Sequence, residues 1–136
     1  MTTKTNGETT LSPKIYRLID ANLNRLREGI RVIEDIQRYI FDNKELSKRL
    51  KNLRHKSRLK DEKKYIIHRD ITGDVSKETT ESEKNRKNIS SIMIANIKRA
   101  EESSRVLEEC LKLIDTKKSQ KFKLIRYELY DIEKSL

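Results

Sequence analysis

Residues 21–35 read ANLNRLREGIRVIED, and residues 95–109 read ANIKRAEESSRVLEE. Seven of the fifteen aligned positions are identical without a gap, and the apolar positions also correspond. The identical pairs are Ala21/Ala95, Asn22/Asn96, Arg25/Arg99, Glu28/Glu102, Arg31/Arg105, Val32/Val106 and Glu34/Glu108. Gly29 corresponds to Ser103, and two small residues in mid-helix favour a close crossing. The two copies therefore predict a pseudo-two-fold pair of helices packed face to face.

The polar residues of the repeat recur every three positions, which shifts each one back by about 60° around a helix. Asn22 then lies at the edge of the apolar stripe, whereas Arg31 points away from it. In one interpretation, Asn22 and Asn96 hydrogen-bond across the helix pair, and Arg25–Glu28 and Glu28–Arg31 are ion pairs along the helix. In the other, the asparagine and first arginine of both copies line one shared polar site. We favour ion pairing for the glutamates and outward arginines, and leave both interpretations open for the rest.

Apolar residues at helical spacing predict further helices around this pair. Ser12-Pro13 is typical of a helix start, because serine caps helices and proline is tolerated at the first helical position. The predicted helices run from there to about Phe41, over a basic stretch marked by Leu46, Leu50 and Leu53, from about Ser82 to Ile114, and from Phe122 to Leu136. Asp42-Asn43 breaks the first helix, and residues 65–80 have no helical period and predict an ordered loop. This pattern predicts an all-α, four-helix bundle-like domain.

Length and composition limit the chain to one such domain. With 136 residues it can bury one core, so we expect a flexible leader over residues 1–11 and a single helical domain over 12–136. No apolar run approaches the ~18 residues that a membrane helix needs, and residues 1–10 carry no apolar signal core. The single cysteine, Cys110, cannot form an internal disulfide, which fits a protein of the reducing cytoplasm.

The net charge of +10 is concentrated in one segment. Residues 44–69 hold eleven Lys or Arg against three acidic residues, a net charge of +8. A localised basic segment indicates an anionic partner, and charge alone does not choose between a phosphate ester and nucleic acid. The sequence contains no phosphate-binding glycine loop and no dinucleotide or protein-kinase motif. Any nucleotide must therefore be held by side chains and helix N-termini.

Two further groups of residues are candidates for binding phosphate. Arg54 and His55 close the apolar stripe of the second helix, where an arginine can grip a phosphate with two hydrogen bonds. In the loop, Arg69 and Asp70 are followed four residues later by Asp74; two carboxylates can share a Mg²⁺ bound to substrate phosphates while the arginine offsets charge. The alternatives are surface roles for the first pair and simple turn-capping by the aspartates.

The order of these motifs is similar to that of a known family. The matching segments are DANLNR at 20–25 with REGIRVIED at 27–35, LRH at 53–55, Arg69-Asp70 with Gly73-Asp74-Val75, Ala95-Asn96 with Lys98-Arg99, RVLEE at 105–109, and RYELYDIE at 126–133. Together they resemble the small helical hydroxymethylpyrimidine-phosphate kinases, a domain that is often fused ahead of thiamine-phosphate synthase and also occurs free-standing. The resemblance covers roughly residues 15–134. Ser76 and the stretch Ser103-Ser104 depart from the family pattern.

The resemblance implies an enzyme of thiamine biosynthesis that transfers the γ-phosphate of ATP to 4-amino-5-hydroxymethyl-2-methylpyrimidine phosphate, giving the diphosphate. It further implies Mg²⁺ and a functional association with thiamine-phosphate synthase, in the free-standing form. From charge and motif position we assign Arg69 and Asp70 to catalysis, and Asp70 and Asp74 to Mg²⁺. Substrate and phosphate binding is assigned to Asn22, Arg25, Arg54, His55, Asn96 and Arg99.

The alternative is a basic helical module without catalysis, which binds nucleic acid or docks on a thiamine-phosphate synthase. The basic segment 44–69 supports it. Against nucleic acid, the basic residues are not interleaved with aromatic ones, and the polar residues of the repeat are balanced in sign. A bundle this small offers little concave surface for two ligands, so a homo-oligomer with a site shared between subunits is a further arrangement that the sequence leaves open.

Overall fold

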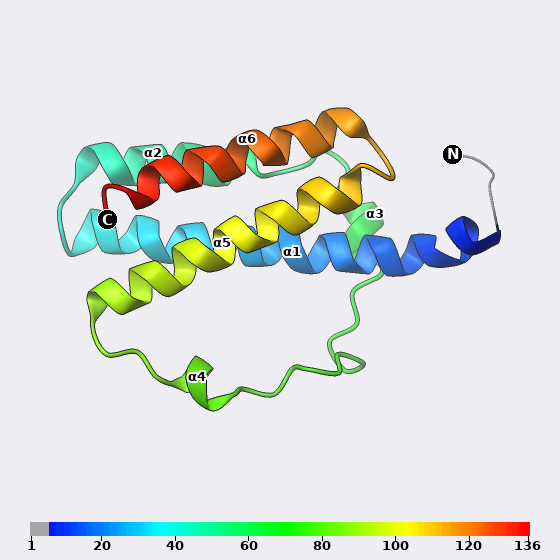
Figure 1. Cartoon of the computed structure of the whole chain (residues 1–136), viewed down its shortest axis with the longest axis horizontal. Helices are drawn as coiled ribbons and strands as arrows, with labels where there is room; N and C mark the ends of the chain where they lie inside the picture. The colour runs from blue at the N-terminus through cyan, green and yellow to red at the C-terminus, as the bar shows by residue number, and fades with distance from the viewer. Residues whose placement is uncertain (1–5) are drawn as a thin grey trace.

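The two repeated segments lie on the two longest helices of the computed structural model, α1 (Asn6–Tyr39) and α5 (Ile89–Leu111). The structure describes the backbone of residues 6–136 and the side chains of residues 13–81 and 84–136. The two helices run antiparallel and cross, while α2 (Lys44–Lys56) packs on α1 and α6 (Thr116–Glu133) packs on α5 (Figure 1). The segment between α2 and α5 contains two single turns, α3 (Lys63–Ile66) and α4 (Glu81–Lys84). The described backbone contains no strand, and the predicted all-α bundle is confirmed.

The predicted start of the first helix is wrong. α1 begins at Asn6, and Pro13 lies inside it instead of at its first turn. The side chain of Ser12, the predicted cap, lies outside the described residues, as do residues 1–5 of the predicted leader; residues 6–11 are helical. A proline inside a helix removes a backbone hydrogen bond and is usually disfavoured there, but α1 contains one. A Ser-Pro pair alone therefore does not fix where a helix begins.

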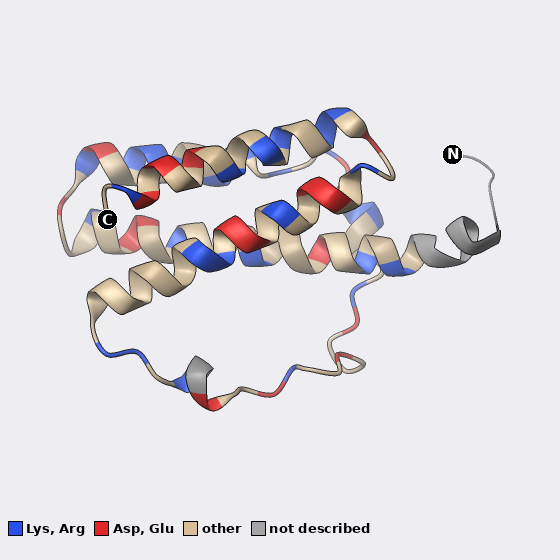
Figure 2. Cartoon of the chain, in the orientation of Figure 1, with Lys and Arg blue, Asp and Glu red and all other residues tan. Residues whose placement is uncertain are grey.

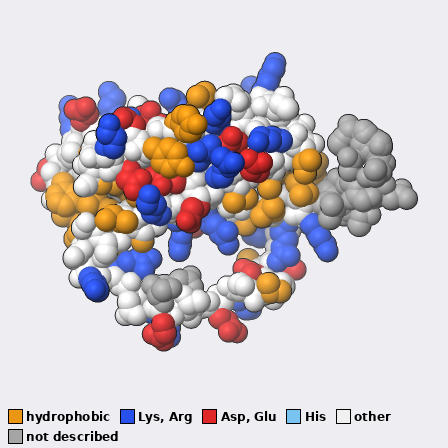
Figure 3. All heavy atoms as spheres, viewed as in Figure 1, with side chains coloured by type: hydrophobic (Ala, Val, Ile, Leu, Met, Phe, Trp, Pro, Cys, Tyr) orange, Lys and Arg blue, Asp and Glu red, His pale blue; other side chains and the backbone are white. Residues whose placement is uncertain are grey.

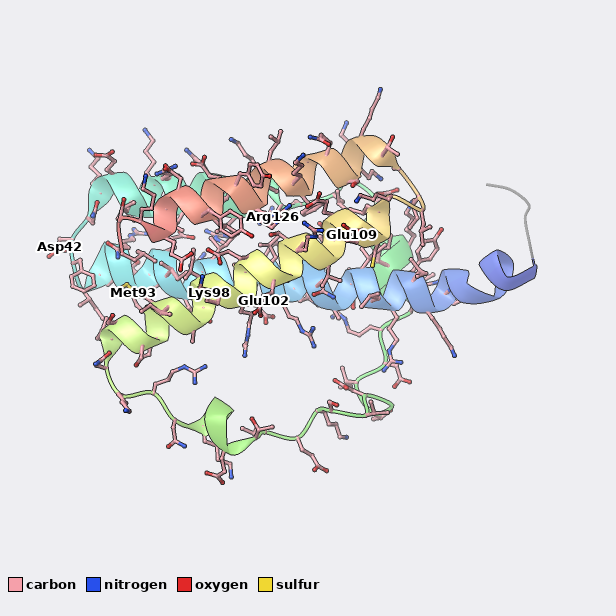
Figure 4. The ribbon with its side chains drawn as sticks, in the orientation of Figure 1. Asp42, Met93, Lys98, Glu102, Glu109 and Arg126 are labelled. Atoms are coloured by element: carbon pink, nitrogen blue, oxygen red, sulfur yellow. The ribbon has the colours of Figure 1, made fainter. Side chains whose placement is uncertain are left out.

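The predicted break between the first two helices is confirmed. Asp42 has a positive φ of 52°, a left-handed conformation that aspartate tolerates better than most residues. Asn43 then caps α2 by accepting a hydrogen bond from the backbone N–H of Leu46 at 3.0 Å. Ile40, which the predicted first helix includes, lies beyond the end of α1 and is 52% exposed. Asp42 is labelled in this connection in Figure 4.

The third long helix begins at Ile89, not near Ser82 as predicted. Asn88 and Ser91 form a capping box, in which each side chain accepts a hydrogen bond from the backbone N–H of the other. This arrangement satisfies N–H groups at a helix end, and it starts α5 seven residues later than the apolar spacing suggests. The residues before it form only the single turn α4 and irregular backbone.

The core is made by the predicted apolar positions of all four long helices. Those on α1 and α5 meet at the centre, and those on α2 and α6 cover them from the same side. The buried residues are Leu23, Leu26, Ile30, Ile33, Leu46, Leu50, Leu53, Ile97, Ala100, Leu107, Leu111, Phe122, Ile125, Leu129 and Ile132. Among the described residues, no helix combines the length and the apolar character that crossing a membrane requires.

The close crossing of α1 and α5 occurs at Gly29. A Cβ atom at this position would lie 2.9 Å from the backbone oxygen of Asn96 and 3.5 Å from the Cβ of Ala100. The first distance is too short for a carbon against a backbone oxygen, so the helices approach this closely only because residue 29 is glycine. The predicted packing of the two copies at their small residues is confirmed at this position.

Replacing Gly29 with alanine is therefore expected to destabilise the fold by about 1–3 kcal/mol, because α1 and α5 must move apart to admit the methyl group. Higher intrinsic helix propensity of alanine offsets less than about 1 kcal/mol of this cost. Chemical denaturation measures the change, with Ser103→Ala, at the equivalent position of the second copy, as the control. Equal stabilities for Gly29→Ala and the wild type would show that the crossing is not tightly packed.

Ion pairs show that the repeat is larger than one helix. Arg54 of α2 donates from Nε and Nη2 to the carboxylate of Glu34 on α1, at 2.7 and 3.2 Å. Arg126 of α6 donates from Nη2 to the carboxylate of Glu108 on α5, at 2.7 Å. Glu34 and Glu108 are equivalent in the repeat, and Figure 4 shows Arg126 reaching from α6 toward α5. The duplicated unit is thus a helical hairpin, α1–α2 and α5–α6.

The sequence of the second helix in each hairpin agrees with this duplication. When Arg54 is aligned with Arg126, Ser47 matches Ser119 and Lys51 matches Lys123, and the buried Leu50 and Leu53 match Phe122 and Ile125. The capping residues Asn43 and Asp115 also align. The first helices of the two hairpins are offset by 74 residues and the second helices by 72, so the connections differ in length by two residues. This part of the repeat was not found in the sequence analysis.

A carboxyl pair joins α5 to α6 on the second hairpin. Glu101 is 4% exposed, its Oε2 has no hydrogen-bond partner within the described residues, and Lys98 lies 3.4 Å from its Oε1. Lys98 also pairs with Glu133 at 2.9 Å. Burial is the main cause that raises the pKa of Glu101 to about 7, and the neighbouring carboxyl group of Glu133 is the second. The contact between the two carboxyl groups lowers the pKa of Glu133.

This pair predicts that the fold is more stable at pH 5.5 than at pH 8. The pKa of Glu101 is higher in the folded protein than its ordinary value of 4.5 in the unfolded chain, so the folded protein binds this proton more tightly. The resulting stabilisation is complete below pH 4.5 and is lost as the pH rises through about 7. We expect a loss of about 1–2 kcal/mol in the free energy of unfolding, measured by denaturation at both pH values. Glu101→Gln should remove this loss. If the Glu101→Gln variant lost as much stability between pH 5.5 and pH 8 as the wild type, Glu101 would not be the group responsible.

Candidate functional site

The structure uses only part of the repeated polar residues to hold the fold. Glu34 and Glu108 tie the hairpins, as described above. The outward arginines of each copy pair along their own helix, Arg31 with Asp35 at 3.3 Å and Arg105 with Glu109 at 3.2 Å. Pairing of these arginines is as predicted, although their partners lie four residues ahead and the predicted Arg25–Glu28 and Glu28–Arg31 pairs are not formed.

Arg25 and Arg99 form no ion pair or hydrogen bond with the described residues, and both are exposed. The same holds for the exposed Glu28 and Glu102, which have no close ion-pair partner. Figure 2 shows the alternation of basic and acidic residues along α5. In each copy, the arginine and glutamate of the segment Asn-x-x-Arg-x-x-Glu therefore have no ion-pair partner among the described residues, while the remaining charges stabilise the bundle.

The two asparagines behave alike, but not as one interpretation predicted. Asn22 donates from Nδ2 to the backbone oxygen of Leu18 at 3.0 Å, and Asn96 donates to that of Ile92 at 2.9 Å. Each amide is therefore held by its own helix, and the predicted hydrogen bond across the helix pair is wrong. The Oδ1 atoms accept no hydrogen bond from the described residues; Asn22 is almost completely buried at the cleft, whereas Asn96 is half-buried.

The loop after α3 is fixed on α1 by an arginine. Arg69 donates from Nε and Nη2 to the two carboxylate oxygens of Asp20, at 2.7 and 2.8 Å, and Asp20 is almost completely buried. Arg17 of α1 donates to the backbone oxygen of Asp70 at 3.1 Å. Because Asp20 occupies only the Nε–Nη2 edge of the guanidinium, the Nη1–Nη2 edge of Arg69 stays open to an anion. The side chain of Arg69 is 43% exposed, which gives a ligand access to that edge.

Asp70 and Asp74 shape the next turns of the loop. The Oδ1 of Asp70 accepts hydrogen bonds from the backbone N–H of Gly73 at 2.8 Å and the hydroxyl of Thr72 at 3.1 Å. These bonds lower the pKa of Asp70, and a Cβ at residue 73 would collide with its carboxylate, which explains the glycine. The Oδ1 of Asp74 accepts from the backbone N–H of Ser76 at 2.9 Å. Both aspartates thus cap turns, as the alternative predicted, while their Oδ2 atoms have no hydrogen-bond partner among the described residues.

A cleft of about 460 Å³ lies between α1 and this loop. It brings together the predicted residues Asn22, Arg25, Arg69, Asp70 and Asp74, which come from segments about fifty residues apart. Polar residues that the sequence analysis did not assign to a site also line it, namely Lys14, Arg17, Asp20 and Asn24, and Leu18, Ala21 and Ile71 make up the remainder. The cleft combines carboxylates, guanidinium groups and side-chain amides, which is a set of groups suited to a phosphorylated ligand.

The other predicted residues lie outside this cleft. Arg54 is bound to Glu34 in the hairpin, so the structure gives it a structural contact in place of the predicted open position. His55 is exposed on α2. Asn96 and Arg99 lie on α5 and do not line the cleft, although their equivalents Asn22 and Arg25 do.

A comparison of the two copies contains the signal for one of the missed residues. Asp20 and Arg17 correspond to Ile94 and Ser91 in the second copy, so the polar contacts to the loop belong to the first copy alone. Asp20 precedes the first repeated segment, whereas Ile94 precedes the second, and this difference indicates a polar contact that only the first segment makes. Lys14 and Asn24 gave no such signal.

The larger hollow of the surface is a groove of about 690 Å³ between α2 and α6. Lys56, Lys117 and Lys121 line it, together with the partly exposed Tyr127. The acidic residues of its lining, Glu128 and Asp131, are both paired with Arg49. None of the predicted site residues lies in this groove, so we place the candidate site in the smaller cleft, where carboxylates and arginines meet.

The smaller cleft contains two loop carboxylates, those of Asp70 and Asp74. Among the described side chains, no group of three or more His, Cys, Asp or Glu is arranged to hold a metal ion. Mg²⁺ usually takes one or two carboxylates from a protein and completes its shell with water and substrate phosphates. Asp70 and Asp74 use their Oδ1 atoms in the turns, and their Oδ2 atoms form no hydrogen bond with the described residues.

Comparison with known proteins gives one family. A model described as the ThiD2 family matches residues 17–135. Similar curated relatives are the thiamine-phosphate synthase of Nostoc punctiforme, 38% identical over 123 residues, and that of Synechococcus sp., 38% identical over 130 residues. The matches cover 90% and 95% of this chain but only 35% and 37% of those proteins. No solved structure matches the chain.

Proposed function

The chain belongs to the ThiD2 family, and on that premise we propose that it acts in thiamine biosynthesis, as an ATP-dependent kinase of 4-amino-5-hydroxymethyl-2-methylpyrimidine phosphate. The observation that carries the proposal is the cleft between α1 and the loop after α3, where Arg25, Arg69, Asp70 and Asp74 come together. The chain spans little more than a third of the curated relatives that it matches, so their printed activity is not transferred to it.

The proposed reaction needs little acid–base chemistry. An oxygen of the pyrimidine monophosphate, already ionised at neutral pH, attacks the γ-phosphorus of ATP, and the bond to the β-phosphate oxygen breaks. The products are the pyrimidine diphosphate and ADP. Catalysis of such a transfer consists of positioning two polyanions and neutralising their charge. A cleft with arginines and without a histidine among its lining residues is suited to that task.

The roles of the residues follow from their contacts. Arg69, held by Asp20 at one edge, presents its other edge to a phosphate, and Arg25 adds a second unpaired guanidinium. Asn22 presents Oδ1 as an acceptor, for example for an amino group. Asp70 and Asp74 would hold Mg²⁺, which when bound neutralises the β- and γ-phosphates. The lowered pKa of Asp70 keeps that carboxylate ionised for this purpose.

Asparagine in place of Asp70 and Asp74 together is expected to raise the Mg²⁺ concentration needed for half-maximal turnover at least tenfold. The asparagine Oδ1 keeps the hydrogen bonds of both turns, whereas the negative charges are lost. A titration of the initial rate with MgCl₂ measures the change. Asp61→Asn, an aspartate outside the cleft, is the control. Unchanged Mg²⁺ dependence in the double variant would remove the two aspartates from the metal site.

A coupled assay of ADP release tests the proposal. We expect purified protein with ATP and Mg²⁺ to turn over the pyrimidine monophosphate but not the unphosphorylated pyrimidine, because the attacking group is a phosphate oxygen. Turnover of the unphosphorylated compound alone would contradict the reaction proposed. Turnover of neither would favour a docking or binding module, and would direct attention to the basic groove between α2 and α6.

A further inference from the structure

The duplicated hairpin contains a second set of ligand-binding groups that the cleft does not use. Asn96, Arg99 and Glu102 on α5 repeat Asn22, Arg25 and Glu28 on α1 at the same spacing. The structure treats the two sets alike, since both asparagines donate to their own helix and both arginines lack an ion pair. The remaining repeated charges form ion pairs within the bundle in both copies. The arginine and the glutamate of the Asn-x-x-Arg-x-x-Glu segment are thus the repeated charges that form no ion pair with the described residues in either copy.

Both sets lie on one face of the bundle. α2 and α6 cover the same side of the α1–α5 pair, and the segment that carries α4 arches past the opposite side (Figure 1). Arg25 and Arg99 each lie about 100° around their helix from the buried Leu26 and Ala100, on the side of the small residues Gly29 and Ser103. Figure 3 shows an opening between this face and the α4 segment, bordered by Lys and Arg side chains.

The two sets are also close along the helices. Gly29 lies against Asn96 and Ala100, so the second set begins where α1 and α5 touch. Arg25 precedes Gly29 by one turn and Arg99 follows Asn96 by one turn, which places each within roughly 6 Å along its helix axis of the crossing. Two ligands bound to the two sets would therefore meet at the crossing. Glu102 follows Arg99 on the edge of α5 (Figure 4).

The sets differ in their surroundings. The set on α1 has the loop with Asp70 and Asp74, fixed by the Asp20–Arg69 pair. At the equivalent of Asp20 the second copy has Ile94, which cannot bind an arginine. The set on α5 therefore offers the Arg99 guanidinium to a phosphate and has no carboxylates from this loop. A nucleotide polyphosphate travels with Mg²⁺, whereas a monoester does not require it.

From this asymmetry we infer that Asn96 and Arg99 form a second, distinct half-site, which binds the phosphate of the pyrimidine monophosphate. The set on α1, with Arg69 and the two aspartates, binds the Mg²⁺–ATP partner. The inference rests on the proposed function and adds to it which reactant each copy of the repeat holds. The duplication thus supplies one phosphate site for each of the two polyanions, one on α1 and the other on α5, next to the point where the helices cross.

Single arginine variants test this division. Arg99→Ala is expected to raise KM for the pyrimidine monophosphate tenfold or more and to leave KM for ATP within threefold. Arg25→Ala should show the reverse. Arg105→Ala, which removes an arginine of the same repeat that is paired with Glu109, is the matched control and should change neither. Because Arg25 and Arg99 are exposed and unpaired, neither variant should disturb folding.

Equilibrium binding separates this inference from the proposed function. Calorimetry with Mg²⁺ and a non-hydrolysable ATP analogue, and separately with the pyrimidine monophosphate, needs no turnover. A wild type that binds neither ligand would overturn the proposed function and this inference with it. A wild type that binds both, with Arg99→Ala binding the monophosphate equally tightly or losing the ATP analogue instead, would overturn the half-site alone.

Discussion

Arg69→Ala is expected to lower kcat/KM for the proposed phosphoryl transfer by about 10²- to 10³-fold, the range seen when a preorganised charge-stabilising donor is removed. The guanidinium is fixed by two hydrogen bonds to the buried Asp20, so its open edge is held in one place before a ligand arrives. Lysine at this position keeps the charge but cannot bind Asp20 and a phosphate with paired hydrogen bonds, so Arg69→Lys should recover only part of the activity.

The loss must be distinguished from a disturbed loop. Arg31→Ala removes an arginine that is paired on the surface with Asp35, and should leave turnover unchanged. Asp20→Asn keeps the volume at residue 20 and frees Arg69 from its position; it should lower kcat/KM by a smaller factor than Arg69→Ala. A folded Arg69→Ala variant with turnover within threefold of the wild type would remove Arg69 from the site.

Glu108→Ala is expected to lower the free energy of unfolding by about 3–5 kcal/mol, the largest stability change that we predict. Its partner Arg126 is 8% exposed, and the Nε of Arg126 has no hydrogen-bond partner among the described residues. Removing the carboxylate leaves a buried guanidinium whose remaining hydrogen bond among the described residues goes to the hydroxyl of Tyr130, at 3.2 Å, beside cation–π contacts with the rings of Tyr127 and Tyr130. Thermal unfolding should show a decrease in Tm of roughly 10–20 °C.

The neighbouring residue provides the control. Glu109 makes only exposed ion pairs, with Arg105 and Lys112, so Glu109→Ala should change stability by less than about 1 kcal/mol. Replacement of both members of the buried pair, as in Glu108→Leu with Arg126→Met, should restore most of the stability, since no charge is then left buried. Equal effects of Glu108→Ala and Glu109→Ala would show that the pair does not hold the hairpin together.

Helix periodicity predicted the long helices and the core, because each buries a continuous stripe that only helical spacing aligns. Leu26, Ile97 and Leu129 are buried as their positions require. Helix starts were predicted less well. Ser12-Pro13 looked like a start, but a proline is tolerated within α1. At α5, the start depends on the mutual hydrogen bonds of Asn88 and Ser91, which apolar spacing does not reveal.

The duplication was only half visible in the sequence. The repeated segments on α1 and α5 share charged residues, which are easily recognised. α2 and α6 share mainly a pattern of capping residue, apolar stripe and arginine, shifted by two residues through the shorter second connection. Only the ion pairs Glu34–Arg54 and Glu108–Arg126 identify the hairpin as the repeated unit.

The predicted site residues that line the cleft are those whose types are chemically unusual for their place. Arg69, Asp70 and Asp74 stood out in a loop between apolar anchors, and Asn22 at the edge of a buried stripe. Arg54 does not line the cleft, and the sequence could not show this, because an arginine after an apolar stripe looks the same whether it faces a phosphate or a glutamate of the neighbouring helix. Asp20 was missed because its role depends on a loop fifty residues away.

The most direct test of the central proposal is ³¹P NMR of the product formed from ATP, Mg²⁺ and the pyrimidine monophosphate. The proposal predicts that the monophosphate resonance is replaced by two coupled resonances of a diphosphate monoester, as the γ-phosphate signal of ATP disappears and ADP appears. Release of inorganic phosphate from ATP, with the pyrimidine monophosphate unchanged, would contradict it.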